Sequence, residues 1–430
     1  MLYKKKEMTR KMSKMNKKLC LAACLIVIWL VFISNSKIEV KGQNISSSSW
    51  DRARVTFEEF LRRPDNLTAW EFLNSIPADV GENVDKEKFI KYLDDNNRRY
   101  QIIMLEMEAG NKYAARAAIR LLPFLEGKIE DKLRMSLSEL VRINPEIFLR
   151  ACYEERDSLF IRTNGYPVSH LAEAMEYNRE IAYFELQKRR EALKSVEGLE
   201  LQSVRDKCIK DIEKAMKELG IKGVACGKGR LRISGNLIQD IKSAFDEIIK
   251  VPCPENFKQL VDLLPERANN DVSYLLDQLL FPKAKSPDYG KQEILPYIIW
   301  HEARCGNEDA IELLFVLDSF YYCMDIYNMI IRGAISALIL SNPALFVEKL
   351  AKYQKRFRSQ GKIIDICTDQ IYCGYPDEST GAFILEKRVV ALEGLNMPQY
   401  KEVIEHCIRI LKDEIEIYRK PVIRFKLHKK

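Results

Sequence analysis

The feature that most constrains this 430-residue chain is an internal repeat with a period near 200 residues. Short motifs of the first half recur in the second half in the same order. The recurring motifs are Pro64-Asp-Asn and Pro254-Glu-Asn, Gly110-Asn111 and Gly306-Asn307, Asn144-Pro145 and Asn342-Pro343, Gly165-Tyr166-Pro167 and Gly374-Tyr375-Pro376, and Phe184-x-Leu-x-Lys-Arg and Phe383-x-Leu-x-Lys-Arg. Self-similarity at a fixed period indicates a repeat architecture, so we expect a tandem duplication of one folding unit.

The repeat also predicts the domain boundaries. Repeat unit 1 is expected at residues 51–220 and repeat unit 2 at residues 238–420, with a glycine-rich linker at 221–237. The flanking segments are a basic and apolar segment at 1–36, a polar linker at 37–50 and a basic tail at 421–430.

Apolar side chains within each unit recur every three or four residues, which is the period of an amphipathic helix. Three such stripes are Ala114, Ala115, Ala118, Ile119 and Leu122; Leu133, Met135, Leu137, Leu140 and Val141; and Ile404, Cys407, Ile408, Ile410 and Leu411. We therefore expect an all-α fold of two similar multi-helix units, stacked into one curved array or joined as two lobes.

Two of the repeated motifs have the composition of helix ends. In Asn144-Pro145 and Asn342-Pro343, the asparagine suits the N-cap, where its oxygen accepts a free backbone N–H, and the proline suits the first helical position. The Gly-Tyr-Pro motif is expected to form a rigid loop that leads into the next helix, because proline restricts the backbone.

The motifs Gly110-Asn111 and Gly306-Asn307 predict tight joints between consecutive helices. The glycine suits the left-handed residue that ends one helix, and the asparagine suits the cap that begins the next. Such joints resemble those of HEAT-type and related α-solenoid repeat proteins. The resemblance implies a helical repeat protein and specifies no partner.

The amino-terminal residues have the parts of an export signal. Residues 1–18 carry eight basic side chains and one acidic side chain, which equals the net charge of +7 of the whole chain. The uncharged apolar run 19–33 follows, and the small residues Ser34 and Ser36 come after it. A basic segment, an apolar segment and a small-x-small site predict a secretory signal peptide with cleavage near Ser36.

Two alternatives to cleavage stay open at this segment. Residues 19–35 can be retained as a transmembrane anchor, although the apolar run as a helix spans only roughly 22 Å of a core of roughly 30 Å. The sequence Leu21-Ala-Ala-Cys24 also resembles a lipidation site, which would place a lipid on Cys24. In each case, the basic end predicts that the folded region lies outside the cytoplasm.

The charge distribution disfavours a nucleic-acid partner. The other 412 residues carry 61 basic and 61 acidic side chains, whereas a nucleic-acid-binding domain would place a basic excess on its folded part. Basic runs such as Lys188-Arg189-Arg190 are expected to be solvated helix faces. The tail from Arg419 onward holds six basic residues and no acidic residue, so binding of an anionic surface by this tail is an alternative.

The cysteines allow one disulfide prediction. Cys367 and Cys373 are both present in the second unit, and the equivalent positions of the first unit hold Ser158 and Asn164. An oxidising compartment outside the cytoplasm would permit a bond between the two cysteines. The alternative is a coincidence of two unpaired thiols.

The sequence contains no signature of a catalytic, cofactor or metal site. The helix-like stretch from His301 to Cys305 lacks the second histidine of a zinc helix, so His301 is expected to be a partly buried or surface residue. No dinucleotide loop and no nucleophile elbow is present. The duplicated Glu106 and Glu302 are expected to cap the next helix, with an acid for chemistry as the alternative.

These observations predict an exported or membrane-anchored helical-repeat protein that acts as a binding or scaffold module outside the cytoplasm, with an unknown protein partner. Two alternatives stay open. The first is an enzyme with a site in a groove between helices or between the two units. The second is an envelope-binding protein that uses its basic tail.

Overall fold

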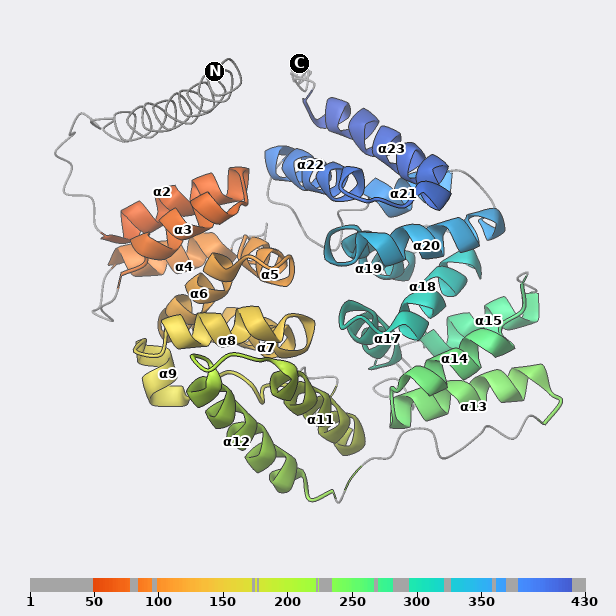
Figure 1. Ribbon diagram of the computed structural model, residues 1–430, viewed down its shortest axis with the longest axis horizontal. Helices are drawn as coiled ribbons and strands as arrows, with labels where there is room; N and C mark the ends of the chain where they lie inside the picture. The colour runs from red at the N-terminus through yellow and green to blue at the C-terminus, as the bar shows by residue number, and fades with distance from the viewer. Residues whose placement is uncertain are drawn as a thin grey trace, which may run out of the picture. The chain divides into compact units, whose positions relative to one another are not determined.

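The computed structural model describes most of residues 49–419 (Figure 1). The internal segments outside this description are 78–83, 95–98, 172–174, 176–177, 222, 224–233, 267–269, 281–293, 321–325, 358–360 and 369–377. The predicted signal or anchor, including Cys24 and Ser36, and the basic tail at 421–430 also lie outside the described residues. The corresponding expectations therefore stay predictions.

The described secondary structure is entirely helical, as the apolar periodicity predicts. The helices of the first half are α2 (Ser49–Arg62), α3 (Asn66–Ser75), α4 (Val84–Asp94), α5 (Gln101–Glu108), α6 (Lys112–Leu121), α7 (Lys128–Ile143), α8 (Pro145–Glu154), α9 (Leu159–Asn164), α11 (Arg179–Ser195) and α12 (Gln202–Leu219). Those of the second half are α13 (Leu237–Lys250), α14 (Pro254–Leu263), α15 (Asn270–Leu280), α17 (Ile294–Arg304), α18 (Glu308–Phe320), α19 (Ile326–Ser341), α20 (Pro343–Tyr353), α21 (Gly361–Thr368), α22 (Glu378–Glu393) and α23 (Lys401–Arg419).

The two halves place their helices against the same neighbours. In the first half α5 packs on α6 and α7, and in the second half α17 packs on α18 and α19. The last pair of each half, α11 with α12 and α22 with α23, is also in close contact. The helices named here thus occur in the same order and have similar neighbours in both halves, whereas α9 packs on α6 and α21 packs on α19 and α23.

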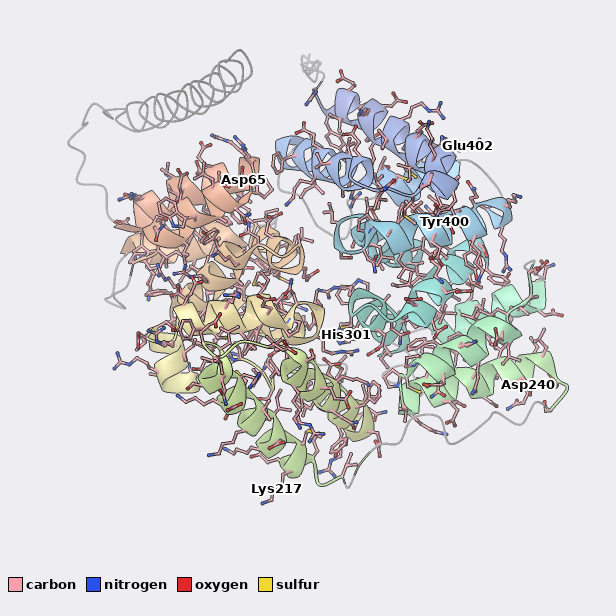
Figure 2. The ribbon with its side chains drawn as sticks, in the orientation of Figure 1. Asp65, Lys217, Asp240, His301, Tyr400 and Glu402 are labelled. Atoms are coloured by element: carbon pink, nitrogen blue, oxygen red, sulfur yellow. The ribbon has the colours of Figure 1, made fainter. Side chains whose placement is uncertain are left out.

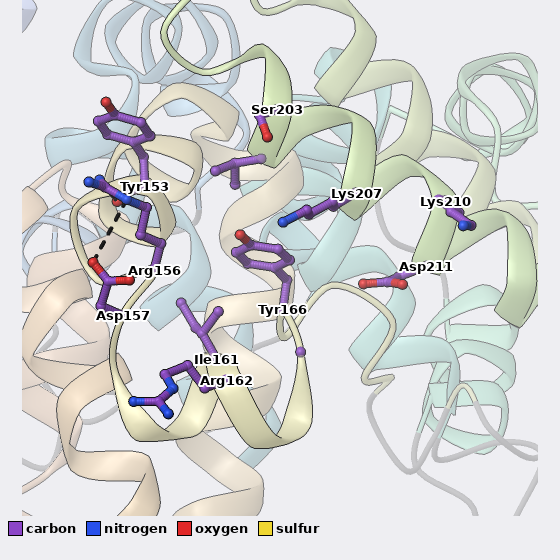
Figure 3. Close-up of a pocket in the computed structure, with 12 residues that line it drawn as sticks. Tyr153, Arg156, Asp157, Ile161, Arg162, Tyr166, Ser203, Lys207, Lys210 and Asp211 are labelled. Carbon is purple, nitrogen blue, oxygen red and sulfur yellow. Dashed lines mark hydrogen bonds and ion pairs between the residues drawn. The ribbon is translucent and has the colours of Figure 1, made fainter.

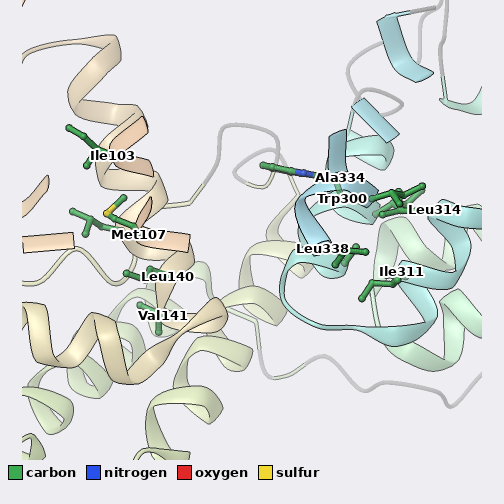
Figure 4. Close-up of a cluster of buried hydrophobic side chains, with 14 of the residues drawn as sticks. Ile103, Met107, Leu140, Val141, Trp300, Ile311, Leu314, Ala334 and Leu338 are labelled. Atoms are coloured by element: carbon green, nitrogen blue, oxygen red, sulfur yellow. The ribbon is translucent and has the colours of Figure 1, made fainter. Parts of the chain in front are cut away.

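The predicted apolar stripes form the core. Their members are buried, apart from Met135 and Ile408, which are half-buried. Figure 4 shows part of this core, with Leu140 from α7 and Leu338 from α19, each four residues before an Asn-Pro motif. Among the described residues, no helix combines the length and the apolar character that a membrane span requires.

The two Gly-Asn joints have the same geometry. Gly110 and Gly306 adopt positive φ angles of 91° and 83°. Asn111 N–H donates to the carbonyl of Glu106 at 2.8 Å, and Asn307 N–H donates to the carbonyl of Glu302 at 3.0 Å. The asparagine oxygens then accept the backbone N–H groups of Ala114 and Ala310 and so cap α6 and α18. This short turn fixes where the carboxylates of Glu106 and Glu302 project.

The two Asn-Pro joints are also alike. Asn144 has φ −150° and ψ 78°, and Asn342 has φ −151° and ψ 70°. Their side-chain oxygens accept from the N–H groups of Ile147 and Leu345, at 3.1 and 3.3 Å. These caps begin α8 and α20 directly after α7 and α19, so each pair of consecutive helices packs closely.

Candidate functional site

A basic pocket of about 760 Å³ opens between the end of α8, α9, the loop after α9 and the start of α12 (Figure 3). Its lining residues are Tyr153, Arg156, Asp157, Ile161, Arg162, Gly165, Tyr166, Ser203, Val204, Lys207, Lys210 and Asp211. The volume lies in the range of ligand-binding pockets. The pocket therefore is the candidate binding site of the described chain.

The Gly-Tyr-Pro loop of the first half forms one wall of the pocket. Gly165 has φ 77° and ψ −165°, a conformation that is restricted to glycine in practice. Ser138 Oγ donates to the carbonyl of Pro167 at 2.5 Å, and Arg189 Nη1 donates to the carbonyl of Val168 at 3.0 Å. Both donors are fully buried, so they hold the loop from inside while Tyr166 faces the pocket.

The lining carries an excess of positive charge, with four basic and two acidic side chains. Arg156 is engaged, because its Nη1 donates to the Tyr153 carbonyl at 2.9 Å and its Nε lies 3.9 Å from Asp157. The side chains of Arg162, Lys207 and Lys210 form no ion pair or hydrogen bond with any described residue. Three lining cations are therefore without an anionic partner in the described part of the chain. Lys207 lies beside Tyr166, whereas Arg162 and Lys210 lie at opposite ends of the lining (Figure 3).

Tyr166 stands in the middle of the pocket and supplies a neutral donor. Burial raises its pKa to about 12, and the nearby Cys208, Cys152 and Asp211 act in the same direction. Its hydroxyl therefore keeps its proton at neutral pH and is able to donate a hydrogen bond. Lys207 points toward the same ring (Figure 3). Val204 and Ile161 add buried apolar surface beside it.

A second cluster of functional groups lies where helices of the two halves meet. We call it the inter-half ionic cluster; its members are Glu108, Glu139, Arg142, Glu185, Arg189, Tyr297, His301, Glu302 and Arg304. Arg142 is its centre, with Nη1 at 2.7 Å from Glu185 Oε2 and at 2.5 Å from Glu302 Oε1. Arg142 Nη2 also donates to Glu302 Oε2 at 3.1 Å. This arginine thus joins a carboxylate of its own half to one of the other half.

His301 occupies the interior of this cluster and is labelled in Figure 2. It is fully buried, so the expectation of a partly buried or surface residue was wrong. Its Nε2 lies 3.1 Å from Glu185 Oε2, and its ring stacks on Tyr297, which donates to Glu139 at 2.5 Å. Burial alone would lower the pKa of His301, but Cys305 and Glu185 outweigh burial and raise it well above 6.5. These neighbours favour the protonated form of the imidazole.

The charges of the cluster also shift the pKa values of its carboxylates. Burial alone would raise the pKa of Glu185, yet Arg142, His301 and Arg189 hold it well below its usual range. Glu108, at the margin, differs: burial raises its pKa to about 7, although the paired Arg304 acts in the opposite direction. Glu185 is thus ionised at neutral pH, whereas Glu108 titrates there.

Three members of the cluster have the donor types of a metal site. One oxygen each of Glu185 and Glu302 and one nitrogen of His301 lie within 4.8 Å of one another. The guanidinium of Arg142 already lies against both carboxylates. A divalent cation would have to displace this guanidinium. The two carboxylates are therefore paired with Arg142.

Glu106 forms a contact between the halves that mirrors the contact of Glu302. Lys387 of α22 approaches Glu106 Oε1 at 2.5 Å, and Asn111 Nδ2 donates to Glu106 Oε2 at 3.2 Å. Neither Glu106 nor Glu302 caps a helix itself, because in both joints the asparagine does so. Each glutamate instead accepts from the amide of the capping asparagine, and each pairs with a cation of the other half.

Cysteines contribute one covalent link to the described part of the chain. Cys253, at the start of α14, is disulfide-bonded, while Cys152, Cys208, Cys305, Cys367 and Cys407 are free thiols. Its bonding partner is therefore not one of these five. Cys373 and the second Gly-Tyr-Pro motif, Gly374-Tyr375-Pro376, lie outside the described residues. Cys367 is a free thiol in this structure, so the structure does not contain the expected Cys367–Cys373 bond.

Sequence reasoning missed the buried charges because it treated basic runs as solvated faces. That expectation was wrong for Arg189, which is fully buried and pairs with Glu185 at 2.8 Å. Its counterpart Arg388 is also buried and donates to the Cys367 carbonyl at 2.8 Å. The recurrence of this arginine within the repeated motif was the available signal, because a solvated charge has little reason to recur.

Comparisons with known proteins add no assignment. No family model matches the chain, and no curated protein and no solved structure matches it.

Proposed function

We propose that the chain is an exported or membrane-anchored helical-repeat protein that acts as a binding module outside the cytoplasm through the basic pocket. The observation that carries this proposal is the set of three basic side chains, Arg162, Lys207 and Lys210, that line the pocket without a described anionic partner. The disulfide of Cys253 supports the location, because such bonds persist in oxidising compartments.

We also propose that the two halves arose by tandem duplication of a HEAT-like helical unit. The matching helix order, the equal geometry of the Gly-Asn and Asn-Pro joints and the buried Arg189 and Arg388 support this proposal. The halves then diverged at the pocket. The positions equivalent to Lys207 and Asp211 hold His406 and Ile410 in the second half. A different lining would confine the binding site to the first half.

The inter-half ionic cluster favours a structural role over the alternative of an enzyme site between the units. Its central carboxylates, Glu185 and Glu302, already contact Arg142, and His301 is fully buried. A substrate would therefore have to displace buried ion pairs. The alternative of a basic tail that binds the envelope concerns residues outside the description, and deletion of the chain from Arg419 tests it separately.

The export proposal is tested by fusing residues 1–60 to a reporter that is active only outside the cytoplasm. The binding proposal is tested by capture of partners from the native envelope with the wild-type chain, an Arg162→Gln/Lys207→Gln variant and a Lys214→Gln control. Lys214 lies on α12, the helix that carries Lys207; it is exposed and does not line the pocket. We expect a partner that the wild type and the control retain and the pocket variant loses. Equal retention by all three chains would refute a role of the pocket.

A further inference from the structure

The charge of the pocket points to the kind of ligand that it binds. Four basic and two acidic lining side chains leave an excess of two positive charges. A dianion would balance this excess, whereas a single carboxylate would leave half of it unbalanced. A phosphate monoester carries a charge close to −2 at neutral pH and offers three acceptor oxygens.

The hydrogen-bonding groups of the pocket fit the same chemistry. The lining offers the planar guanidinium of Arg162, the ammonium groups of Lys207 and Lys210, and the hydroxyl groups of Ser203 and Tyr166. Guanidinium groups bind phosphate through paired N–H donors, and lysines bind it as point charges. The guanidinium and the two ammonium groups only donate hydrogen bonds, whereas the two hydroxyl groups both donate and accept. The set therefore suits a ligand that is rich in acceptor oxygens.

The remaining lining surface suits a ligand body rather than a bare ion. The pocket of about 760 Å³ is much larger than a phosphate group. The Tyr166 ring and the buried side chains of Ile161 and Val204 provide apolar contact area beside the cations. A ligand that combines a phosphate with a ring or an alkyl chain would use both parts of the surface.

We infer that this pocket binds a phosphate monoester, with the phosphate at Lys207, the organic part against Tyr166, and Arg162 and Lys210 adding positive charge from the two ends of the lining. The inference rests on the proposed binding function and specifies its ligand class. Two sources share this chemistry: a soluble phosphorylated small molecule and the headgroup of an anionic lipid such as phosphatidic acid.

The test is isothermal titration calorimetry of the full-length chain with phenyl phosphate, and with benzoate as a singly charged ring of similar size. We expect phenyl phosphate to bind at one site, at least tenfold more tightly than benzoate. Lys207→Gln should weaken it about tenfold, because it removes a charge-assisted hydrogen bond. Arg162→Gln should weaken it less, because Arg162 lies at one end of the lining and adds positive charge from there. The control Lys214→Gln should change the affinity less than twofold, and helical circular dichroism should be equal in all variants.

The pH dependence provides a second readout. The lining contains no histidine, so the second ionisation of the ester, near pH 6, is the titration expected at the pocket. The affinity for phenyl phosphate should therefore rise between pH 5 and pH 7, and the affinity for benzoate should not. Equal affinity for both probes, no binding of phenyl phosphate, or equal losses in Lys207→Gln and Lys214→Gln would each overturn the inference.

Vesicles distinguish the two sources. Binding to phosphatidylcholine vesicles that contain phosphatidic acid, with loss in Lys207→Gln, would support a lipid headgroup as the source. Binding of phenyl phosphate without such vesicle binding would support a soluble ester. If the pocket variant loses a native partner while neither probe binds, the ligand class is wrong and the proposed binding function stands. If phenyl phosphate binds but no native partner depends on the pocket, the proposed partner-binding role fails instead.

Discussion

Replacement of Arg142 by methionine tests the contact between the two halves most directly. The Arg142 side chain is only 10% exposed, and the Glu185 and Glu302 side chains that it joins are 1% and 4% exposed. Methionine fills a similar volume but leaves two buried carboxylates without this cation. Removal of one partner of a buried ion pair costs about 3–5 kcal/mol, because the remaining charge stays desolvated.

The structure indicates which carboxylate accounts for most of this loss. Glu185 keeps Arg189 at 2.8 Å and His301 at 3.1 Å. Among the described residues, Glu302 keeps only a long contact of 3.4 Å from Asn307 Nδ2. Neutralisation of this residue in Arg142→Met/Glu302→Gln should therefore recover about 1–3 kcal/mol, within the usual range for coupled neighbours.

The assay is urea unfolding of the full-length chain at pH 7, followed by circular dichroism. With an m-value of about 3 kcal/mol/M, Arg142→Met should lower the unfolding midpoint by about 1–1.7 M. The control is Arg150→Met, because Arg150 forms a comparable pair with Glu146 on an exposed face, with side chains 42% and 57% exposed. Such a pair contributes about 0–1 kcal/mol. Equal midpoints for the two single variants would refute the buried bridge between the halves.

Three further changes test other parts of the fold. Because the pKa of Glu108 rises from 4.5 to about 7 on folding, the folded state holds more protons and the wild type loses stability as pH rises through this window. Glu108→Gln should reduce this pH-dependent loss of stability by about 1–3 kcal/mol. The measurement is the urea midpoint of the wild type and the variant at pH 5 and pH 8. The same change in midpoint between the two pH values in both proteins would contradict this prediction. Gly165→Ala should cost about 1–3 kcal/mol in thermal unfolding because of its backbone angles, whereas Gly394→Ala, at a negative φ, should stay within about 0.5 kcal/mol. Asn307→Ala should lower the free energy of unfolding, measured in urea, by about 1–2 kcal/mol. The control is Asn236→Ala, which removes an exposed N-cap and should cost less. Equal costs for the two variants would argue against the bond from Asn307 to Glu302.

The local elements of the fold could be predicted because their causes are local. The stripe from Leu133 to Val141 is helical because apolar groups three or four residues apart lie on one helix face. Asn144 ends α7 and begins α8 because its side chain accepts a backbone N–H and Pro145 has none to donate. Each interaction spans a few residues, so the motif contains the information.

The two candidate sites could not be predicted in the same way. Glu185 and His301 are 116 residues apart, and Arg142 and Glu302 are 160 residues apart. No local pattern distinguishes a charge that will be paired in the interior from one that will be solvated. The pocket combines Arg162 from α9 with Lys207 from α12, and each is an ordinary exposed cation in its own helix. In the sequence, only the repeated Gly165-Tyr166-Pro167 motif distinguished this region from its surroundings.

By itself, the sequence determined the helices, their caps and the order in which similar motifs return along the chain. These properties depend on backbone hydrogen bonding and on side-chain spacing within one or two turns. The tertiary structure alone decided that Arg189 and His301 are buried and that Glu302 pairs with Arg142 of the other half. The physical reason is desolvation: a charge enters the interior only where an opposite charge from another segment meets it, and helix packing fixes that meeting.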